Sequence, residues 1–207
     1  MKVKKKKLKV AITGSIGSGK TTFSDFLKES GYPVIFADDV SKTILAKDPQ
    51  VRKIVRDSFG KGAYSGNKIN KEFLADNIFS NPQKLKKINS ILHPRVRMKI
   101  EELSDGYFLN NDFVFIEAAL IYESKIEKMY DFVVLITADE KIRQKRSVKS
   151  KKFSKEDFQK RNNAQLDEEK KIKKADFVFY NNGTKKELNA KALLLISILN
   201  SYLNHKD

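Results

Sequence analysis

The sequence contains no cysteine and no tryptophan, and only four of its 207 residues are proline. Without cysteine there can be no disulfides, no thiolate metal ligands and no cysteine nucleophile. No apolar run approaches the roughly 20 residues that a membrane-spanning helix requires, and the apolar stretch after Lys7 is too short for a secretory signal. We therefore expect a cytoplasmic protein that has no membrane partner.

Acidic residues are scarce relative to basic ones, which gives a formal net charge of +16. A surplus of lysine is typical of proteins that bind a nucleic-acid backbone. The lysines are nevertheless spread along the whole chain, and no aromatic motif for stacking bases is present. The densest cluster, KVKKKK at residues 2–7, is interpreted as a solvated segment before the first strand. A basic surface equally suits a ligand with several phosphates, so we expect no specific nucleic-acid partner.

What the sequence does contain is a globular composition, with 40% hydrophobic and 33% charged residues. A chain of this length can bury one substantial core but is short for two independent domains. Apolar, β-branched runs alternate with segments of helical periodicity. Strands are predicted at residues 8–13, 32–37, 112–120, 130–138 and 175–182, and helices at 21–30, 42–59, 71–81, 82–106, 140–174 and 185–203. This alternation predicts one α/β domain over residues 1–207, with a parallel sheet in a three-layer fold.

The first predicted strand runs directly into a glycine-rich loop. Its sequence, GSIGSGKT at residues 14–21, satisfies GxxxxGK[ST] and lies between a predicted strand and a predicted helix, as a phosphate-binding P-loop requires. The glycines allow backbone N–H groups to converge on phosphate oxygens at the positive end of the helix dipole. Lys20 is expected to reach the β and γ phosphates of ATP, and the Thr21 hydroxyl to ligate Mg²⁺. The predicted nucleotide-binding residues of this P-loop NTPase fold are Gly14, Ser15, Ile16, Gly17, Ser18, Gly19, Lys20, Thr21 and Thr22.

The rest of the sequence separates the classes of P-loop protein. A GTPase needs an Asn-Lys-x-Asp motif, and the nearest match, NKIN at residues 67–70, lacks the aspartate. A motor or helicase needs a longer chain and a strand that ends in paired acidic residues, whereas VFIEAAL at residues 114–120 offers only Glu117. A small-molecule kinase is therefore the favoured class. The alternative from another class is a basic P-loop module that binds nucleotide and nucleic acid.

A kinase also needs a carboxylate beside the acceptor hydroxyl, and cations that balance the charge on the transferred phosphoryl group. Asp38 and Asp39 follow the second predicted strand, and the carboxyl ends of parallel strands face one crevice. We assign Asp38 the role of general base and Asp39 a role at the start of the next helix. The basic stretch at residues 143–161 has the composition of a mobile lid that closes over ATP.

These motifs resemble those of the dephospho-coenzyme A kinase family, and the resemblance covers nearly the whole chain. TGSIGSGKTT at residues 13–22 is similar to the family's TGGIGSGKST, with Ser15 in place of the second glycine. Asp38 falls on the second aspartate of the family's Asp-Ala-Asp, its general base, while Phe36 replaces the first. Asn89, His93 and Pro94 keep the spacing of the family's Leu-Asn-x-x-x-His-Pro.

The resemblance continues in the second half of the chain. EAALIYE at residues 117–123 is similar to a family segment that has proline where Ala119 stands. Arg146, Arg161 and Gln165 match the family's lid pattern, and KKADFVFYNNG at residues 173–183 matches its closing motif. In that motif Asn182 and Gly183 fall near the place where the family holds adenine. The order and spacing of all these matches are together specific.

Three further positions depart from the family pattern, each where the family has arginine. Ser150 stands where a second lid arginine is usual, and Lys42 and Lys71 replace two other arginines. A lysine does not reproduce the bidentate fork of a guanidinium. His93 has two interpretations, a substrate contact or an imidazole that satisfies a buried backbone carbonyl.

The resemblance implies ATP and Mg²⁺ as cofactors and dephospho-coenzyme A as the small-molecule partner. In this mechanism Asp38 accepts the proton of the ribose 3′-hydroxyl while Lys20, Arg146 and Arg161 stabilise the transferred phosphoryl group. The implied substrate contacts are Asp38, His93, Glu117 and Arg161. Residues 68–105 would form a helical coenzyme A subdomain and residues from about 140 to 174 the lid. A nucleoside or nucleotide kinase remains an alternative. The two kinds of kinase differ in the acceptor that they phosphorylate.

Overall fold

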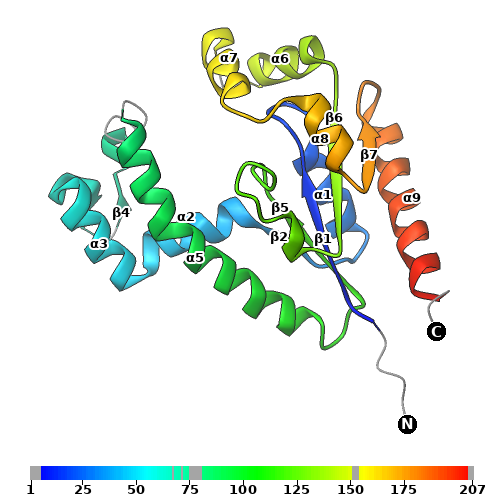
Figure 1. Ribbon diagram of the computed structural model, residues 1–207, viewed down its shortest axis with the longest axis horizontal. Helices are drawn as coiled ribbons and strands as arrows, with labels where there is room; N and C mark the ends of the chain where they lie inside the picture. The colour runs from blue at the N-terminus through cyan, green and yellow to red at the C-terminus, as the bar shows by residue number, and fades with distance from the viewer. Residues whose placement is uncertain (1–5, 67, 71, 75–80, 151–153, 205–207) are drawn as a thin grey trace. The chain divides into compact units, whose positions relative to one another are not determined.

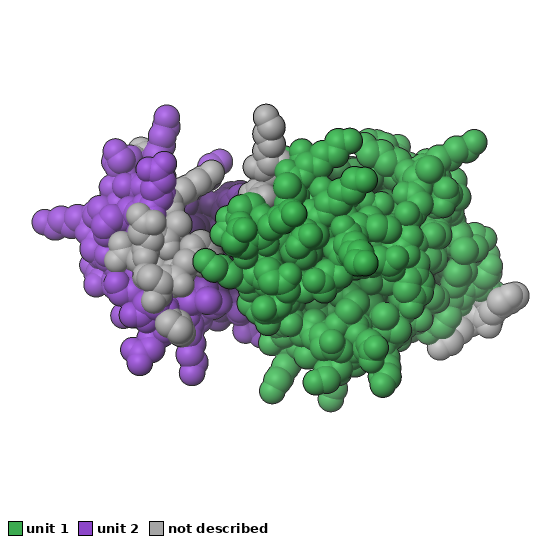
Figure 2. Space-filling view, turned by 90° about the horizontal axis from the view of Figure 1, so that it is seen from above, with its two compact units in different colours: residues 1–35, 106–207 green, residues 36–105 purple. Residues whose placement is uncertain are grey.

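The computed structural model describes residues 6–66, 68–70, 72–74, 81–150 and 154–204. In it the chain divides into two compact units. The first unit joins residues 1–35 to residues 106–207, and the second consists of residues 36–105 (Figure 2). The predicted coenzyme A segment, residues 68–105, falls within the second unit. None of the helices in the described ranges is both long and apolar enough to cross a membrane.

A five-stranded parallel sheet forms the centre of the first unit (Figure 1). Its strands are β1 (Leu8–Thr13), β2 (Val34–Phe36), β5 (Phe113–Glu117), β6 (Phe132–Thr137) and β7 (Phe177–Tyr180). Their order along the sheet is β2-β5-β1-β6-β7, so β1 lies in the middle. All five residues of β5 are buried, as expected for a central parallel strand covered on both faces. The α/β fold predicted from the sequence is confirmed.

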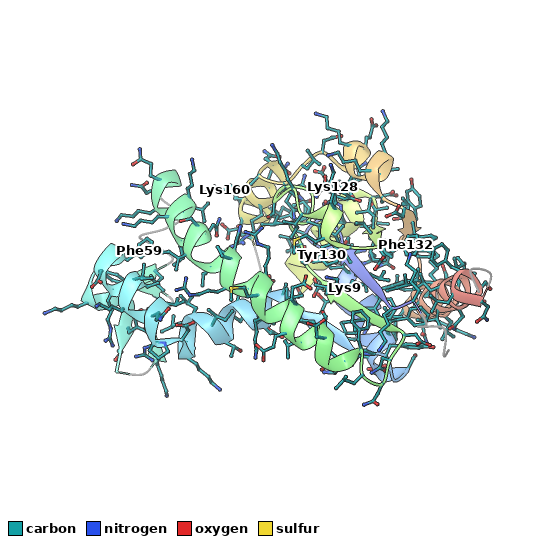
Figure 3. The ribbon with its side chains drawn as sticks, turned by 60° about the horizontal axis from the view of Figure 1, so that its bottom comes forward. Lys9, Phe59, Lys128, Tyr130, Phe132 and Lys160 are labelled. Atoms are coloured by element: carbon teal, nitrogen blue, oxygen red, sulfur yellow. The ribbon has the colours of Figure 1, made fainter. Side chains whose placement is uncertain are left out.

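Helices follow the strands of this sheet along the chain. They are α1 (Lys20–Glu29), α6 (Glu140–Lys149), α7 (Lys155–Asn163), α8 (Glu168–Lys174) and α9 (Lys185–Asn204). Helix α1 packs against α9, and α8 packs against β6. Aromatic rings add to the packing, because the Phe132 ring (labelled in Figure 3) lies 5.4 Å from that of Phe177 and 5.0 Å from that of Tyr202.

The second unit is helical apart from a short hairpin. It contains α2 (Ala37–Lys47), α3 (Pro49–Phe59), the hairpin β3 (Tyr64–Ser65) and β4 (Lys68–Ile69), and most of α5 (Pro82–Tyr107). Its core takes Val51, Val55 and Phe59 from one face of α3, with Phe59 visible in Figure 3. The i, i+4, i+8 spacing of these three residues places them on a single helical stripe.

Local chemistry refines several predicted boundaries in the second unit. The predicted helix 42–59 is two helices, because Asp48 leaves the helical conformation and caps α3 by accepting from the Gln50 and Val51 amides at 2.9 and 3.0 Å. Pro49 then occupies the first turn, where its missing N–H is not needed. The stretch between the predicted helices 42–59 and 71–81 contains the β3–β4 hairpin. Of the helix predicted at 71–81, only residues 72–74 and 81 are described, and 72–74 are helical.

Candidate active site

The P-loop links β1 to α1 and depends on two glycines in left-handed conformations. Gly17 has φ 77° and Gly19 has φ 95°, values that side chains other than glycine rarely adopt. The neighbours leave no room for a side chain either. A Cβ at Gly17 would meet the carbonyl oxygen of Arg143, and a Cβ at Gly19 would meet the side-chain amide of Asn181.

The start of α1 presents the loop's phosphate-binding groups. The helix begins at Lys20, and its first backbone bond runs from the Phe23 amide to the Gly19 carbonyl at 3.0 Å. The amides that precede Phe23 have no partner within the helix, so they are available to an anion at the positive end of the dipole. The loop therefore has the backbone geometry that the sequence predicted for binding phosphate.

Glu117 joins this loop from the neighbouring strand. It ends β5, opposite Ile12 of β1, and is only 7% exposed. One carboxylate oxygen lies 3.9 Å from Lys20 Nζ, and the other accepts a hydrogen bond from Thr21 Oγ1 at 3.4 Å. The structure thus brings together the three predicted site residues Lys20, Thr21 and Glu117.

This trio suits a magnesium nucleotide. Mg²⁺ prefers oxygen ligands and usually takes one or two from the protein, with the others from phosphates and water. The Thr21 hydroxyl and the Glu117 carboxylate supply such oxygens beside the ammonium group that would meet the phosphates. The residues present therefore fit the ion.

The segment after β7 meets α6 at the predicted adenine side. Arg146 donates to the carbonyl oxygens of Asn181 at 2.8 Å and Gly183 at 3.3 Å. Asn182 exchanges two hydrogen bonds with Asp139, one to the side-chain carboxylate at 3.0 Å and one from the backbone amide at 2.9 Å. The predicted residues Arg146, Asn182 and Gly183 are therefore brought together. A guanidinium has five N–H donors, so these two bonds leave others for a ligand.

Asn181 and Arg143 both contact the backbone of the P-loop and were not found from the sequence. Asn181 is buried and donates from its side-chain amide to the Ser18 carbonyl at 2.8 Å. Arg143, 4% exposed, donates to the Ile16 carbonyl at 3.3 Å and to the Asn162 side chain at 2.7 Å. The position of Asn181 directly before Asn182 was a usable signal. Arg143 gave none, because it lies among the exposed cations of the basic stretch.

The predicted acceptor-side residues lie elsewhere in the chain. Asp38 and Asp39 occupy the first turn of α2, where both are exposed and their charges suit the helix dipole. Asp39 also pairs with Lys42 at 2.7 Å, so Lys42, which stands where the family has arginine, contacts a carboxylate. Arg161 is exposed on α7. Lys71 lies outside the described residues.

His93 lies within α5, which continues through Pro94. The side chain is exposed, which disfavours the interpretation that it satisfies a buried carbonyl. Partial desolvation lowers the pKa of the imidazole, and the nearby Arg97 guanidinium lowers it further. The imidazole therefore favours its neutral form, in which it can donate and accept one hydrogen bond each.

The sheet and the loop it presents define the class of protein as a P-loop kinase. A crystal structure of the Thermus thermophilus protein TT1252 superposes with a TM-score of 0.80 at 31% identity, covering 94% of this chain and 99% of that one. The dephospho-CoA kinase from Campylobacter jejuni gives a TM-score of 0.69 at 28% identity, covering 92% of this chain and 96% of that one. A family model described as CoaE, dephospho-CoA kinase, matches residues 8–187. The chain belongs to the dephospho-CoA kinase family.

A curated relative gives the same result. A dephospho-CoA kinase of Bacteroides fragilis is 35% identical over 192 residues, which cover 93% of each chain. The family catalyses ATP-dependent phosphorylation of dephospho-CoA, the last step of coenzyme A biosynthesis, and this chain is a kinase of that family. The phosphate donor is ATP, used with Mg²⁺. The resemblance identified from the sequence motifs is thereby confirmed.

Proposed function

We propose that this chain works in the cytoplasm and transfers the γ-phosphate of ATP to the ribose 3′-hydroxyl of dephospho-CoA, with Asp38 as the general base. The observation that carries the proposal is the trio of Lys20, Thr21 and Glu117 at the head of α1. It places a cation, a hydroxyl and a carboxylate beside the backbone amides at the start of α1, which can bind an anion. Phosphoryl transfer needs this combination of positioning and charge stabilisation.

On the ATP side, the P-loop amides hold the phosphates and Lys20 balances the charge that develops on the transferred group. A bound Mg²⁺ would neutralise part of the charge on the phosphates. Thr21 and Glu117 would hold that ion, Glu117 directly or through water. Arg146 fixes the loop of Asn182 and Gly183 against α6, which shapes the side where adenine would bind.

On the acceptor side, the assignment of Asp38 rests on its position along the chain. Asp38 follows β2 by two residues, and the carboxyl ends of parallel strands share the edge of the sheet that carries a P-loop. Its exposure leaves the carboxylate accessible to a substrate hydroxyl. His93 and Arg161 are proposed as further substrate contacts, residues 68–105 as the coenzyme A subdomain, and residues from about 140 to 174 as the lid.

The base assignment is tested by comparing Asp38→Asn with Asp39→Asn. Both variants keep the shape of the side chain and remove one exposed negative charge from the same helical turn. We expect Asp38→Asn to lower kcat by about 10²-fold or more, the usual contribution of a general base, with ATP affinity nearly unchanged. Asp39→Asn should retain most activity. Unchanged turnover in Asp38→Asn would remove Asp38 from the mechanism.

A further inference from the structure

A buried lysine contacts the first half of the P-loop. Lys171 of α8 has no exposed surface, and a buried ammonium group must be paired because its desolvation is costly. Its Nζ lies 3.1 Å from Glu123 Oε1 and donates a hydrogen bond to Ser15 Oγ at 3.0 Å. The lysine therefore connects α8 to the segment after β5 and to the P-loop.

Ser15 is bound from two sides. Its hydroxyl accepts from Lys171 and donates to Glu168 Oε2. The other oxygen of Glu168 accepts from Thr137 Oγ1 at 2.5 Å, at the end of β6. Ser15 has no positive φ, so a serine is accommodated here without backbone strain, although the family pattern has glycine.

The backbone of the next loop residue is held by the same region of the chain. The Ile16 amide donates to Gln165 Oε1 at 2.9 Å, and the Ile16 carbonyl accepts from Arg143 at 3.3 Å. The linker between α7 and α8 is anchored too, because the Leu166 amide donates to Glu123 Oε1 at 2.9 Å. The Ser15 hydroxyl and the Ile16 backbone groups thus bind residues of the predicted lid region. The groups that would bind phosphate therefore belong to the second half of the loop.

We propose that Lys171 is a positioning residue for the ATP site. Together with Glu168 it holds the Ser15 hydroxyl and so fixes the first half of the P-loop before ATP binds. This proposal rests on the P-loop as the ATP site. A loop that is already shaped loses less conformational freedom on binding its ligand. Hydrogen bonds to charged groups are about twice as strong as neutral ones, which suits them to this role.

Lys171→Met tests the proposal, with Lys170→Met as the matched control on the same helix. Methionine keeps much of the lysine's length and removes the charge, and Lys170 is exposed. ATP affinity is measured by titration calorimetry without any acceptor, and thermal melting records folding. We expect Lys171→Met to weaken ATP binding about tenfold, which corresponds to about 1.4 kcal/mol. Lys170→Met should bind ATP as the unsubstituted protein does.

Ser15→Ala separates positioning from general stability. It removes the contact to Lys171 without leaving a charge unpaired, so it remains informative if Lys171→Met does not fold. We expect Ser15→Ala to weaken ATP binding several-fold, and its effect to be less than additive with that of Lys171→Met. Lys171→Arg should recover part of the affinity. Normal ATP affinity in Ser15→Ala, or in a folded Lys171→Met, overturns the proposal, as do fully additive effects.

The readout separates this proposal from the proposed acceptor chemistry. ATP binding is measured in the absence of acceptor, whereas the acceptor is identified by phosphate transfer in the unsubstituted protein. A failure to phosphorylate dephospho-CoA would leave the calorimetric comparison intact. If the unsubstituted protein phosphorylates dephospho-CoA but Lys171→Met and Ser15→Ala bind ATP normally, only the positioning role of Lys171 is overturned.

Discussion

At the scale of single residues, Glu117 shows how one carboxylate can serve a site that lacks a paired acidic motif. Its two oxygens contact two consecutive residues of the P-loop, Lys20 and Thr21, from the adjacent strand. A buried carboxylate between an ammonium group and a hydroxyl can hold the lysine in place and also offer an oxygen to a cation.

Glu117→Gln is expected to raise the Mg²⁺ concentration needed for half-maximal activity and to lower kcat about 10- to 100-fold, by analogy with residues that orient metal sites. Glutamine keeps the size of the side chain but loses the charge that attracts the cation. The measurement is initial rate against Mg²⁺ concentration at saturating ATP. Glu29→Gln, an exposed change on α1, is the control. An unaltered Mg²⁺ dependence in Glu117→Gln would contradict the assignment.

His93 provides a prediction about pH. Because desolvation and Arg97 lower its pKa in the folded protein, the unfolded chain binds more protons near the ordinary value of about 6.5. The stability that the neutral imidazole contributes is therefore present above that pH and is lost as the pH falls through the folded-state pKa.

An NMR titration of the imidazole C–H signal measures this pKa directly. The chain has two histidines, so the His205→Gln variant leaves one signal to follow. We expect a midpoint below about 6.5, and a higher midpoint when Arg97→Gln removes the neighbouring cation. A midpoint at or above the ordinary value, unaffected by Arg97→Gln, would disprove the described environment.

At the scale of elements, the turn into α1 is specified by more than its glycine pattern. Gly19 and Gly31 have almost the same φ, 95° and 90°, but Gly19 faces Asn181 whereas Gly31 has open space around it. The two positions therefore separate the cost of backbone strain from the cost of crowding.

We expect Gly31→Ala to lower the free energy of unfolding by about 1 kcal/mol, the cost of a left-handed non-glycine residue, and to leave ATP affinity unchanged. Gly19→Ala should cost more, because the new methyl group displaces Asn181, and should weaken ATP binding as well. Urea unfolding and ATP calorimetry measure both effects. Equal effects of the two substitutions on stability and affinity would show that Asn181 does not restrict this turn.

Sequence patterns predicted the elements well where periodicity and burial agree. The five strands and the helix after the P-loop follow from apolar runs and from glycine punctuation, and all occur in the structure. The break at Asp48 was missed because the apolar stripe continues across it, although an aspartate before proline is a recognised start signal. The predicted helix 82–106 ran through Pro94, and α5 does continue through it, although a proline inside a helix usually bends or ends it.

At the scale of the whole molecule, the candidate site was predictable where it is contiguous in sequence and less so where it is assembled by the fold. The residues of the P-loop could all be identified from the sequence motif alone. The contacts of Glu117 with Lys20 and Thr21 depend on strand order, because β5 lies beside β1 although about a hundred residues separate them. The anchoring of Ser15 by Lys171 spans 156 residues, and one lysine among 42 basic residues carries no local sign of burial.

The most direct test of the central claim is to incubate the purified protein with Mg²⁺ and ATP and a panel of acceptors. The panel contains dephospho-CoA, nucleosides and nucleoside monophosphates, with ADP release, product mass and the position of the new phosphate as readouts. The account predicts the gain of one phosphate on the ribose 3′-hydroxyl of dephospho-CoA and on no other acceptor. Transfer to a different acceptor, or no transfer to any of them, would contradict it.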